Sequence, residues 1–252
     1  MASFILITGA SSGFGAATAK LFASKGYGLV LMARRKGKLE DLVQDLSEHI
    51  EAHILVADVR DEEVVRIAIN SLPEHVKTSL SILVNNAGLA VGKGPIDRGL
   101  IEDWDRMIDT NVKGLLYVSR AVIPLLKANN KGHIINIASI AGKEVYPGGN
   151  VYCATKHAVD ALSRAMRIDL INHNIKVSNL APGAAETEFS IVRFKGNEAQ
   201  AKSVYDGYSP LVAQDIAETL WFICSRPEHV NVNDITLMAS AQASAAVFAE
   251  KE

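Results

Sequence analysis

A phenol and an ammonium group stand four residues apart in the segment Tyr152-Cys153-Ala154-Thr155-Lys156. Side chains at i and i+4 share one face of a helix, so the two groups can act together if this segment is helical. A free tyrosine has a pKa of about 10, and lowering that pKa to about 7 takes about 4 kcal/mol, part of which a neighbouring ammonium can supply. Such a phenol would exchange a proton with a substrate oxygen. The same spacing also occurs by chance on helix surfaces, so the interpretation needs supporting residues.

Three glycines lie in the segment Thr8-Gly9-Ala10-Ser11-Ser12-Gly13-Phe14-Gly15, between an apolar run and a helical pattern that begins near Ala16. A turn without side chains lets backbone N–H groups approach a pyrophosphate, and the N-terminus of the following helix then faces the negative charge. Taken alone, the glycines could form an ordinary strand-to-helix turn, but their place after the first strand favours nucleotide binding. We expect the nucleotide to contact Gly9, Ser11, Ser12, Gly13, Phe14 and Gly15.

Basic residues, Arg34-Arg35-Lys36, follow the second apolar run. A fold that selects NAD places an acidic residue here to accept a hydrogen bond from the ribose hydroxyl. A 2′-phosphate carries close to two negative charges, and a guanidinium can hold it through paired, charge-assisted hydrogen bonds. We therefore predict that Arg34 and Arg35 bind the 2′-phosphate of NADP. A solvated, basic start to the next helix is the alternative.

Short runs rich in Val, Ile and Leu alternate with segments of helical period along the chain. Most of the runs are continuously apolar, as expected when helices cover both faces of a parallel sheet. The pattern predicts one doubly wound Rossmann-type α/β domain over residues 1–252, with a seven-stranded parallel sheet flanked by helices. The predicted strands are Phe4 to Thr8, Leu29 to Ala33, His53 to Val56, Ile82 to Val84, His133 to Ala138, Lys176 to Leu180 and Asp234 to Leu237.

Ligands of doubly wound sheets bind beyond the carboxyl ends of the strands, where the strand order reverses. Glycine or polar residues follow six consecutive predicted strands, a coincidence that a purely structural sheet does not need. Besides the glycine loop and the two arginines, this edge is expected to present Asp58, Val59, Asn85, Ala87, Gly88, Ser139, Pro182 and Gly183.

The composition, with 48% hydrophobic and 21% charged residues, is that of a soluble globular protein. A net charge of -2 is too balanced for a surface that neutralises nucleic acid or anionic lipid. No apolar run approaches the roughly 20 residues needed to cross a bilayer, and no signal-peptide pattern precedes the first strand. Cys153 and Cys224 make neither a disulfide framework nor a zinc spacing. We expect a cytoplasmic protein with no metal, no nucleic acid and no membrane partner.

Together these motifs resemble those of the short-chain dehydrogenase/reductase family along nearly the whole chain. The resemblance rests on Thr8-Gly9 to Gly15, Asn85-Asn86-Ala87-Gly88, Asn111, Ser139, Tyr152 with Lys156, and Pro182-Gly183 to Thr187. It implies that Tyr152 is the general acid/base, that Ser139 orients the substrate oxygen, and that Lys156 holds the nicotinamide ribose and lowers the pKa of Tyr152.

The same resemblance implies roles for four further residues. Asn111 would position a water in the proton relay, Asp58 would meet the adenine, Asn85 and the residues after it would line the adenosine side, and Thr187 would contact the carboxamide or phosphate end of the cofactor. From the residues alone, Asn111 could be a polar residue inside a helix, Ser139 a strand-end cap, and Thr187 an ordinary loop residue.

Within the family, Met107 to Asn111, Tyr146 to Tyr152 and Glu186 to Gly196 are similar to the NADP-dependent 3-hydroxy acid dehydrogenases, whose activities include oxidation of L-allo-threonine and serine at the β-hydroxyl. This implies hydride transfer between NADP and the β-carbon of a small hydroxy acid, such as L-allo-threonine, serine or 3-hydroxypropionate. Sulfoacetaldehyde reductases share much of the pattern, so a sulfoacetaldehyde reductase or another small carbonyl reductase is an alternative. A noncatalytic NADP-binding regulator is the alternative from another class.

The stretch at about 186–208 is too long for a simple connection and alternates apolar with charged residues, which is typical of a substrate lid. Arg193 in this stretch could hold a substrate carboxylate or sulfonate. A salt bridge from Arg193 to Glu186 or Glu188 is equally open. Tyr146 and Phe194 could shape the substrate pocket or simply pack the lid.

Helices predicted from about Trp104 to Val122 and from Val151 to Ile171 carry apolar residues around most of their circumference. One sheet face cannot bury all of that surface, so we expect a symmetric homo-oligomer joined through these helices. The family resemblance implies a tetramer. The apolar tail from Met238 to Ala249 would pack on a neighbouring subunit, or else be disordered.

Overall fold

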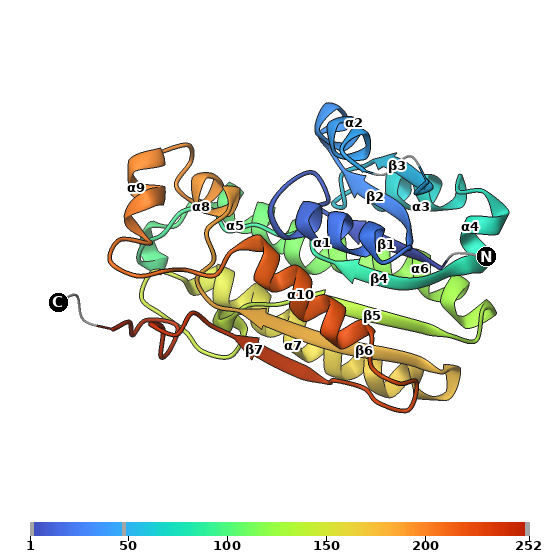
Figure 1. The fold of residues 1–252 in the computed structure, drawn as a ribbon. Coiled ribbons are helices and arrows are strands. Elements are labelled where there is room, and N and C mark those ends of the chain that lie inside the picture. Colours follow the sequence, from blue (N-terminus) through green and yellow to red (C-terminus); the bar gives the residue numbers. More distant parts are fainter. Residues whose placement is uncertain (1–2, 47–48, 250–252) are drawn as a thin grey trace.

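Seven parallel strands form one sheet in the computed structural model, which describes residues 3–46 and 49–249. Their order is β3-β2-β1-β4-β5-β6-β7, so the direction of winding reverses between β1 and β4 (Figure 1). All seven predicted strands are present, with ends within two residues of the expected ones. The strands are β1 Phe4–Thr8, β2 Gly28–Ala33, β3 Ala52–Val56, β4 Leu80–Asn85, β5 Gly132–Ile137, β6 Ile175–Pro182 and β7 Asp234–Leu237.

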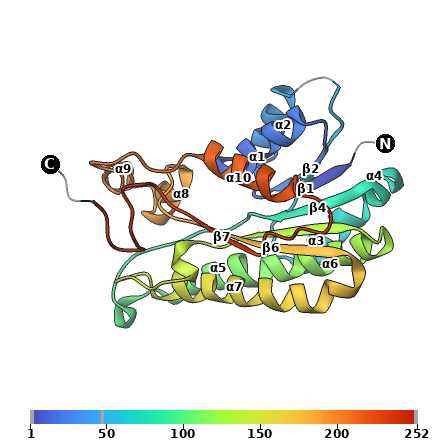
Figure 2. The same ribbon diagram turned by 60° about the horizontal axis from the view of Figure 1, so that its bottom comes forward.

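Helices cover both faces of the sheet, which explains why the strands are continuously apolar (Figure 2). Along β1, Leu6 packs toward one helical layer while Ile5 and Ile7 pack toward the other. One layer holds α1 Gly13–Ser24, α2 Lys36–Gln44 and α10 Ala213–Cys224, and the other holds α3 Glu62–Asn70, α4 Glu74–Ser79, α5 Ile101–Ile108, α6 Leu115–Ala128 and α7 Asn150–Leu170. Short 3-10 turns occupy Ile96–Arg98, Ile140–Gly142 and Ile171–His173.

A wide π-helical turn, Asp109–Gly114, separates α5 from α6, where the sequence predicts one helix from about Trp104 to Val122. Inside this turn the Asn111 side chain leaves the helical layer and bonds to the main chain of Leu89. Gly114 lies so close to Val59 that an added Cβ would be 2.7 Å from the Val59 Cγ2. The prediction of one regular helix is therefore wrong at this point, because these non-local contacts widen the turn.

Two short helices, α8 Glu188–Arg193 and α9 Glu198–Ser203, follow β6 and lie beyond the carboxyl ends of the strands (Figure 1). The chain then returns through α10 to β7. After β7 the tail packs against its own chain: Gln242 Oε1 accepts a hydrogen bond from the Ala184 N–H at 2.8 Å, and the Phe248 ring lies 5.0 Å from the Tyr208 ring. Among residues 3–46 and 49–249, no helix combines the length and the apolar character that a membrane span requires.

Candidate active site

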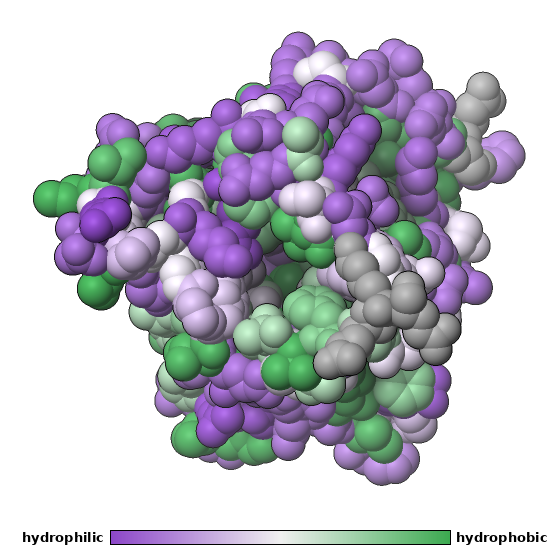
Figure 3. Space-filling model, turned by 90° about the vertical axis from the view of Figure 1, so that its left-hand side faces the viewer, coloured by the Kyte–Doolittle hydropathy of each residue, from purple (hydrophilic) through white to green (hydrophobic). Residues whose placement is uncertain are grey.

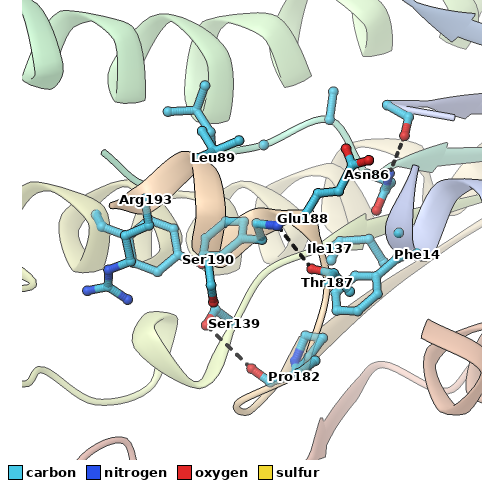
Figure 4. Close-up of a pocket in the computed structure, with 18 of the residues that line it drawn as sticks. Phe14, Asn86, Leu89, Ile137, Ser139, Pro182, Thr187, Glu188, Ser190 and Arg193 are labelled. Atoms are coloured by element: carbon cyan, nitrogen blue, oxygen red, sulfur yellow. Dashed lines mark hydrogen bonds between the residues drawn. The ribbon is translucent and has the colours of Figure 1, made fainter. Parts of the chain in front are cut away.

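A cavity of about 480 Å³ opens at the carboxyl ends of the strands, between the sheet and α8. From this edge the surface is hollowed near its centre, with both hydrophobic and hydrophilic residues on the rim of the hollow (Figure 3). The close-up shows Phe14 and Asn86 at one end of the cavity and Arg193 at the other, with Ser139 between them (Figure 4). The predicted site residues that line it are Gly9, Ser11, Ser12, Gly13, Phe14, Arg34, Arg35, Asp58, Val59, Ala87, Gly88, Ser139, Tyr146, Tyr152, Lys156, Pro182, Gly183, Thr187 and Arg193.

The glycine loop between β1 and α1 has the shape that a pyrophosphate needs. Gly9 has a φ of +65°, and an added Cβ there would lie 3.0 Å from the Ala87 Cα. A Cβ on Gly15 would lie 2.5 Å from the Gly9 carbonyl oxygen, so Gly15 lets the helix pack on the loop without lining the cavity itself. The first turn of α1 has no acidic residue and Ser12 makes no side-chain cap, which leaves backbone N–H groups available to an anion.

Asn85 departs from its expected place on the adenosine side. Its side chain points into the buried helical layer, where Nδ2 donates to Ser119 Oγ at 3.0 Å and to Asn136 Oδ1 at 2.8 Å. Asn86 lines the cavity instead, and its Nδ2 donates to the Thr8 carbonyl oxygen at 2.8 Å. The prediction for Asn85 is wrong because the last residue of β4 continues the face of the strand that lies under the helices.

Two arginines stand at the end of β2, beside the glycine loop. The Arg35 guanidinium donates to Ser11 Oγ and Ser12 Oγ, and it pairs with Glu188 at 2.9 Å. Arg34 lies 3.7 Å from Asp58, whose carboxylate is also held by Arg60 at 2.6 Å. Burial raises the pKa of Asp58, but the Arg60 hydrogen bonds outweigh it, so the pKa lies below its usual value. The end of β2 is thus followed by two guanidinium groups and by no acidic residue, an arrangement that fits a 2′-phosphate.

Tyr152 projects from the first turn of α7 into the cavity, where its ring lies 5.8 Å from the Phe189 ring. Ser139, just after β5, lines the same cavity as Tyr152. The Ser139 hydroxyl accepts from the Ala141 N–H at 3.1 Å and lies 3.4 Å from the Pro182 carbonyl oxygen. Ser139 is therefore both a cap of the turn Ile140–Gly142 and a polar group at the phenol.

Lys156 is one helical turn from Tyr152, as the spacing predicts, but the electrostatics differ from the expectation. The sequence predicts that Lys156 lowers the pKa of Tyr152, but burial of the phenol raises this pKa. The Lys156 ammonium donates to the Ile137 carbonyl oxygen at 2.8 Å and lies 5.9 Å from the Tyr152 ring centroid. Burial lowers the pKa of Lys156 to about 8. The expected acidic phenol is not what these residues alone produce, because the cost of burying the phenolate exceeds the help from its neighbours.

Asn111 lies behind the cavity and does not line it. Its side chain accepts from the Leu89 N–H and donates to the Leu89 carbonyl oxygen, both at 2.8 Å. Its Nδ2 also lies 3.0 Å from Thr155 Oγ1, which in turn donates to the Tyr152 carbonyl oxygen at 2.8 Å. Asn111 thus links the loop after β4 to the turn of α7 that carries the phenol. Thr155 is a member of this network that the motif Tyr-x-x-x-Lys does not single out.

Arg193, at the end of α8, points toward the phenol. Its Nη2 donates to Tyr146 Oη at 2.9 Å, and its guanidinium carbon lies 5.3 Å from the Tyr146 ring centroid and 5.8 Å from that of Tyr152. The Arg193 Nε is buried without a hydrogen-bond partner. The alternative expectation, a salt bridge from Arg193 to Glu186 or Glu188, is not found among the ion pairs of the described residues. Glu188 pairs with Arg35 and Lys38 instead.

Thr187 caps α8 and rests on the glycine loop. Its Oγ1 accepts from the Phe189 N–H at 3.2 Å, and a Cβ on Gly13 would lie 3.5 Å from the Thr187 Cβ. Among the described residues, three side chains that could together hold a metal ion, Glu51, His53 and His75, lie close to one another outside this cavity.

Comparison with protein families finds that a model described as short chain dehydrogenase matches residues 3–198. Sulfoacetaldehyde reductase 2 of Chromohalobacter salexigens is 42% identical to this chain over 253 residues and covers 100% of both chains. The NADP-dependent 3-hydroxy acid dehydrogenase YdfG of Escherichia coli strain K12 is 39% identical over 249 residues, which covers 98% of this chain and 99% of the relative. A solved structure described as the closed form of serine dehydrogenase complexed with NADP+ has a TM-score of 0.92 and 39% identity, and covers 99% of this chain and 100% of that one.

Proposed function

This chain belongs to the short-chain dehydrogenase family, and we propose that it is an NADP-dependent oxidoreductase that acts at the β-carbon of small hydroxy acids or of the matching carbonyl compounds. Relatives named for NADP-dependent 3-hydroxy acid and serine dehydrogenation support the reaction and the cofactor. The observation that carries the choice of an acidic substrate is Arg193, whose guanidinium reaches the cavity beside Tyr152.

The cofactor would be held along the edge of the sheet. In this proposal the N–H groups from Gly9 to Gly15 receive the pyrophosphate, and Arg34 and Arg35 grip the 2′-phosphate. Asp58 and Val59 flank the adenine, and Asn86 takes the place expected for Asn85. Ala87, Gly88, Pro182 and Gly183 also line the cavity, and in this proposal Lys156 and Thr187 contact the nicotinamide half of the cofactor.

When bound, the nicotinamide supplies hydride to a carbonyl carbon or accepts it from an alcohol carbon. During reduction, Tyr152 Oη donates its proton to the carbonyl oxygen, so the product is a neutral alcohol and the phenolate remains. Burial of Tyr152 keeps the phenol protonated for this step, because it raises the pKa of that group. Ser139 donates a hydrogen bond to the same oxygen and aligns it with the phenol.

Lys156 and Asn111 support the phenol from behind. The Lys156 ammonium stabilises the phenolate that forms during reduction and holds the ribose hydroxyls. Since burial lowers the pKa of Lys156 to about 8, this group changes charge close to neutral pH. Asn111, through Thr155, holds the turn of α7 that aims Tyr152, and a water at Asn111 would return the proton.

Arg193 would bind the acid group of the substrate. Its Nη2 is oriented by Tyr146, while its buried Nε has no partner among the described residues. A carboxylate placed there would satisfy that donor, and a charge-assisted hydrogen bond contributes about 1.5–3 kcal/mol. In a small β-hydroxy acid a single carbon, the α-carbon, separates the carboxylate from the reacting β-carbon. This short separation suits an arginine next to the catalytic phenol.

The experiment is NADP-linked turnover by the purified protein with L-allo-threonine, serine, 3-hydroxypropionate, isethionate and neutral alcohols of similar size. We expect hydroxy acids to be oxidised with kcat/KM at least tenfold above the neutral alcohols. Preference for isethionate would favour the second candidate function, reduction of sulfoacetaldehyde. Two observations support this candidate: the relative named sulfoacetaldehyde reductase 2, and the ability of a guanidinium to bind a sulfonate. Tight NADPH binding without turnover of any compound would contradict the proposal and favour a regulator.

We also propose a cytoplasmic homo-oligomer, of tetrameric form by family resemblance. The free cysteines Cys153 and Cys224 support a reducing compartment. Leu116 on α6, Ile168 on α7 and Ile171 in the turn after α7 are exposed, which supports a second copy covering this helical layer. Sedimentation at micromolar concentration checks the assembly, and monomer alone would contradict it.

A further inference from the structure

Two imidazole rings and one carboxylate meet at the edge of the sheet opposite the cavity. Glu51 precedes β3, His53 lies within β3, and His75 lies in the first turn of α4. His53 Nε2 is 2.6 Å from Glu51 Oε1, and His75 Nε2 is 2.8 Å from the same oxygen. Two segments of the chain thus direct two nitrogens and one oxygen to a common point.

The fold holds these side chains in place. Residues two apart on an extended chain point to the same side, which brings Glu51 and His53 together. The Glu51 carbonyl oxygen accepts from the Leu29 N–H at 2.9 Å, which fixes the backbone at this point. The buried Phe4 ring lies 6.1 Å from the His53 ring and 6.2 Å from the His75 ring, so both imidazoles pack on one rigid surface.

We propose that Glu51, His53 and His75 form a binding site for a divalent transition metal, with Zn²⁺ as the expected ion. Two imidazole nitrogens and one carboxylate oxygen are a ligand set of zinc sites that keep a fourth position for water. The three ligand atoms lie within 4.8 Å of one another. Tetrahedral zinc with bonds of about 2.0–2.2 Å separates its ligand atoms by about 3.3–3.5 Å. Glu51 Oε1, which lies 2.6 and 2.8 Å from the two nitrogens, would therefore have to withdraw from them by less than about 1 Å.

The donor atoms of the cluster suit a cation. One carboxylate oxygen, Glu51 Oε1, faces the Nε2 atoms of both imidazole rings. Binding requires each imidazole to present an unprotonated Nε2, which a neutral ring achieves by carrying its proton on Nδ1. The Glu51 side chain is 47% exposed, which leaves it room to turn from a hydrogen-bond acceptor into a ligand.

The ion would tie the start of β3 to α4, the helix that leads into β4. It would stand at the amino ends of the strands, whereas the cavity lies at their carboxyl ends. We therefore expect metal binding to stabilise the fold without entering catalysis. Imidazole ligands suit Zn²⁺, Cu²⁺ and Ni²⁺, whereas Mg²⁺ prefers oxygen ligands, so Mg²⁺ should not bind at this site.

The test is calorimetric titration of the full chain, stripped with a chelator, with Zn²⁺ and separately with Mg²⁺. We expect one Zn²⁺ per chain, no Mg²⁺ uptake, and a rise in Tm of about 5 °C or more at a hundredfold excess over Kd. His75→Gln should bind Zn²⁺ at least tenfold more weakly while NADP-linked turnover is unchanged. His229→Gln, in the exposed loop before β7, is the matched control and should bind like the parent.

The variant Glu51→Gln is a second, independent test of zinc binding at the same site. Its amide oxygen can still accept hydrogen bonds from the two rings but carries no charge, so it should lose zinc affinity even if His75→Gln unfolds. Zn²⁺ uptake that both variants retain would overturn the proposal, as would no uptake by the parent at a tenfold excess of micromolar Zn²⁺. Either result would assign the cluster to hydrogen bonding alone.

Discussion

Arg35 and Glu188 form an ion pair of 2.9 Å that joins the end of β2 to the start of α8, across 153 residues of sequence. Lys38 holds the other carboxylate oxygen at 2.7 Å. Hydrogen bonds from Lys38 and Arg35 lower the pKa of Glu188 to about 2, so the carboxylate stays ionised throughout the working pH range. Glu188 therefore occupies Arg35, one of the two arginines that we assign to the 2′-phosphate, and it connects α8 to the end of β2.

Replacing Glu188 with Gln should tighten NADP+ binding. The variant removes the anion that competes with the 2′-phosphate for Arg35, and exposed ion pairs contribute about 0.2–1 kcal/mol, so Kd should fall by up to about fivefold. Kd for NAD+, which lacks that phosphate, should stay within about twofold. Calorimetry measures both constants. Glu198→Gln, in the first turn of α9, is the matched control and should leave Kd for NADP+ unchanged. If Glu188→Gln also left this Kd unchanged, Glu188 would be separate from the phosphate site.

Arg35→Ala and Arg34→Ala should each weaken the binding of NADPH much more than that of NADH. Loss of charge-assisted hydrogen bonds to the phosphate costs about 1.5–3 kcal/mol each, so Kd for NADPH should rise at least tenfold. Kd for NADH should change by less than about threefold. Lys36→Ala, which removes a cation paired with Glu40 on α2, is the control. Equal losses for the two cofactors would assign the arginines to general electrostatics.

The sequence was sufficient for the sheet and for most of the cavity, because both depend on local patterns. Strands covered on both faces are continuously apolar, and the residue after each such strand falls at one edge. Asn85 follows a different local pattern. Alternation along β4 puts Asn85 on the same face as Leu83, under the helices, and that signal was available in the sequence.

Other features depend on contacts between distant residues and could not be predicted. The π-helical turn arises because Asn111 reaches Leu89, 22 residues away, and no local preference encodes that reach. The pKa of Tyr152 depends on its depth in the folded chain, which the spacing from Lys156 does not report. The cluster of Glu51, His53 and His75 likewise forms only once α4 packs beside β3.

Tyr152→Phe should remove turnover while preserving the cofactor site. A general acid contributes about 10²–10⁴-fold, so kcat should fall by at least about a hundredfold. Kd for NADPH should change by less than about threefold, since the phenol hydroxyl is not a phosphate ligand in our proposal. Stopped-flow fluorescence and steady-state kinetics measure the two quantities. A variant that still turned over at parental rates would exclude Tyr152 as the acid.

The pH profile of reduction should report Lys156. Burial lowers the pKa of this lysine to about 8, so it is charged below that pH and loses the charge above it. Since the charge stabilises the Tyr152 phenolate, kcat/KM for reduction should fall as pH rises through about 8. Lys156→Arg keeps the charge at higher pH, so whatever activity it retains should fall at a higher pH than in the parent. Identical midpoints in the two proteins would remove Lys156 from the proton chemistry.

Arg193→Met should raise KM for acidic substrates. Removing the guanidinium takes away a charge-assisted contact of about 1.5–3 kcal/mol, so KM should rise about tenfold to a hundredfold for a hydroxy acid and by less than about threefold for a neutral alcohol. Lys195→Met is the matched control in the same loop, because Lys195 pairs with Asp103 outside the cavity. Parallel changes for both substrate classes would give Arg193 a structural role.

His133 should make the fold sensitive to mild acid. Its ring, buried in β5, lies 2.7 Å from Ser178 Oγ through Nε2, while Nδ1 has no partner. Burial, with a smaller effect from Lys176, lowers the pKa of His133 from 6.5 to about 3. The folded state therefore keeps the ring neutral while the unfolded chain takes up a proton below about pH 6.5.

The stability that a neutral His133 provides is complete above about pH 6.5 and is lost as pH falls from there toward 3. The free energy of unfolding should therefore drop by a few kcal/mol between pH 7 and pH 4, and by clearly less in His133→Gln, whose side chain does not titrate. Urea unfolding at each pH measures the difference, with His173→Gln, on the turn after α7, as the matched control. Equal slopes for the parent and His133→Gln would show that other groups set the acid sensitivity.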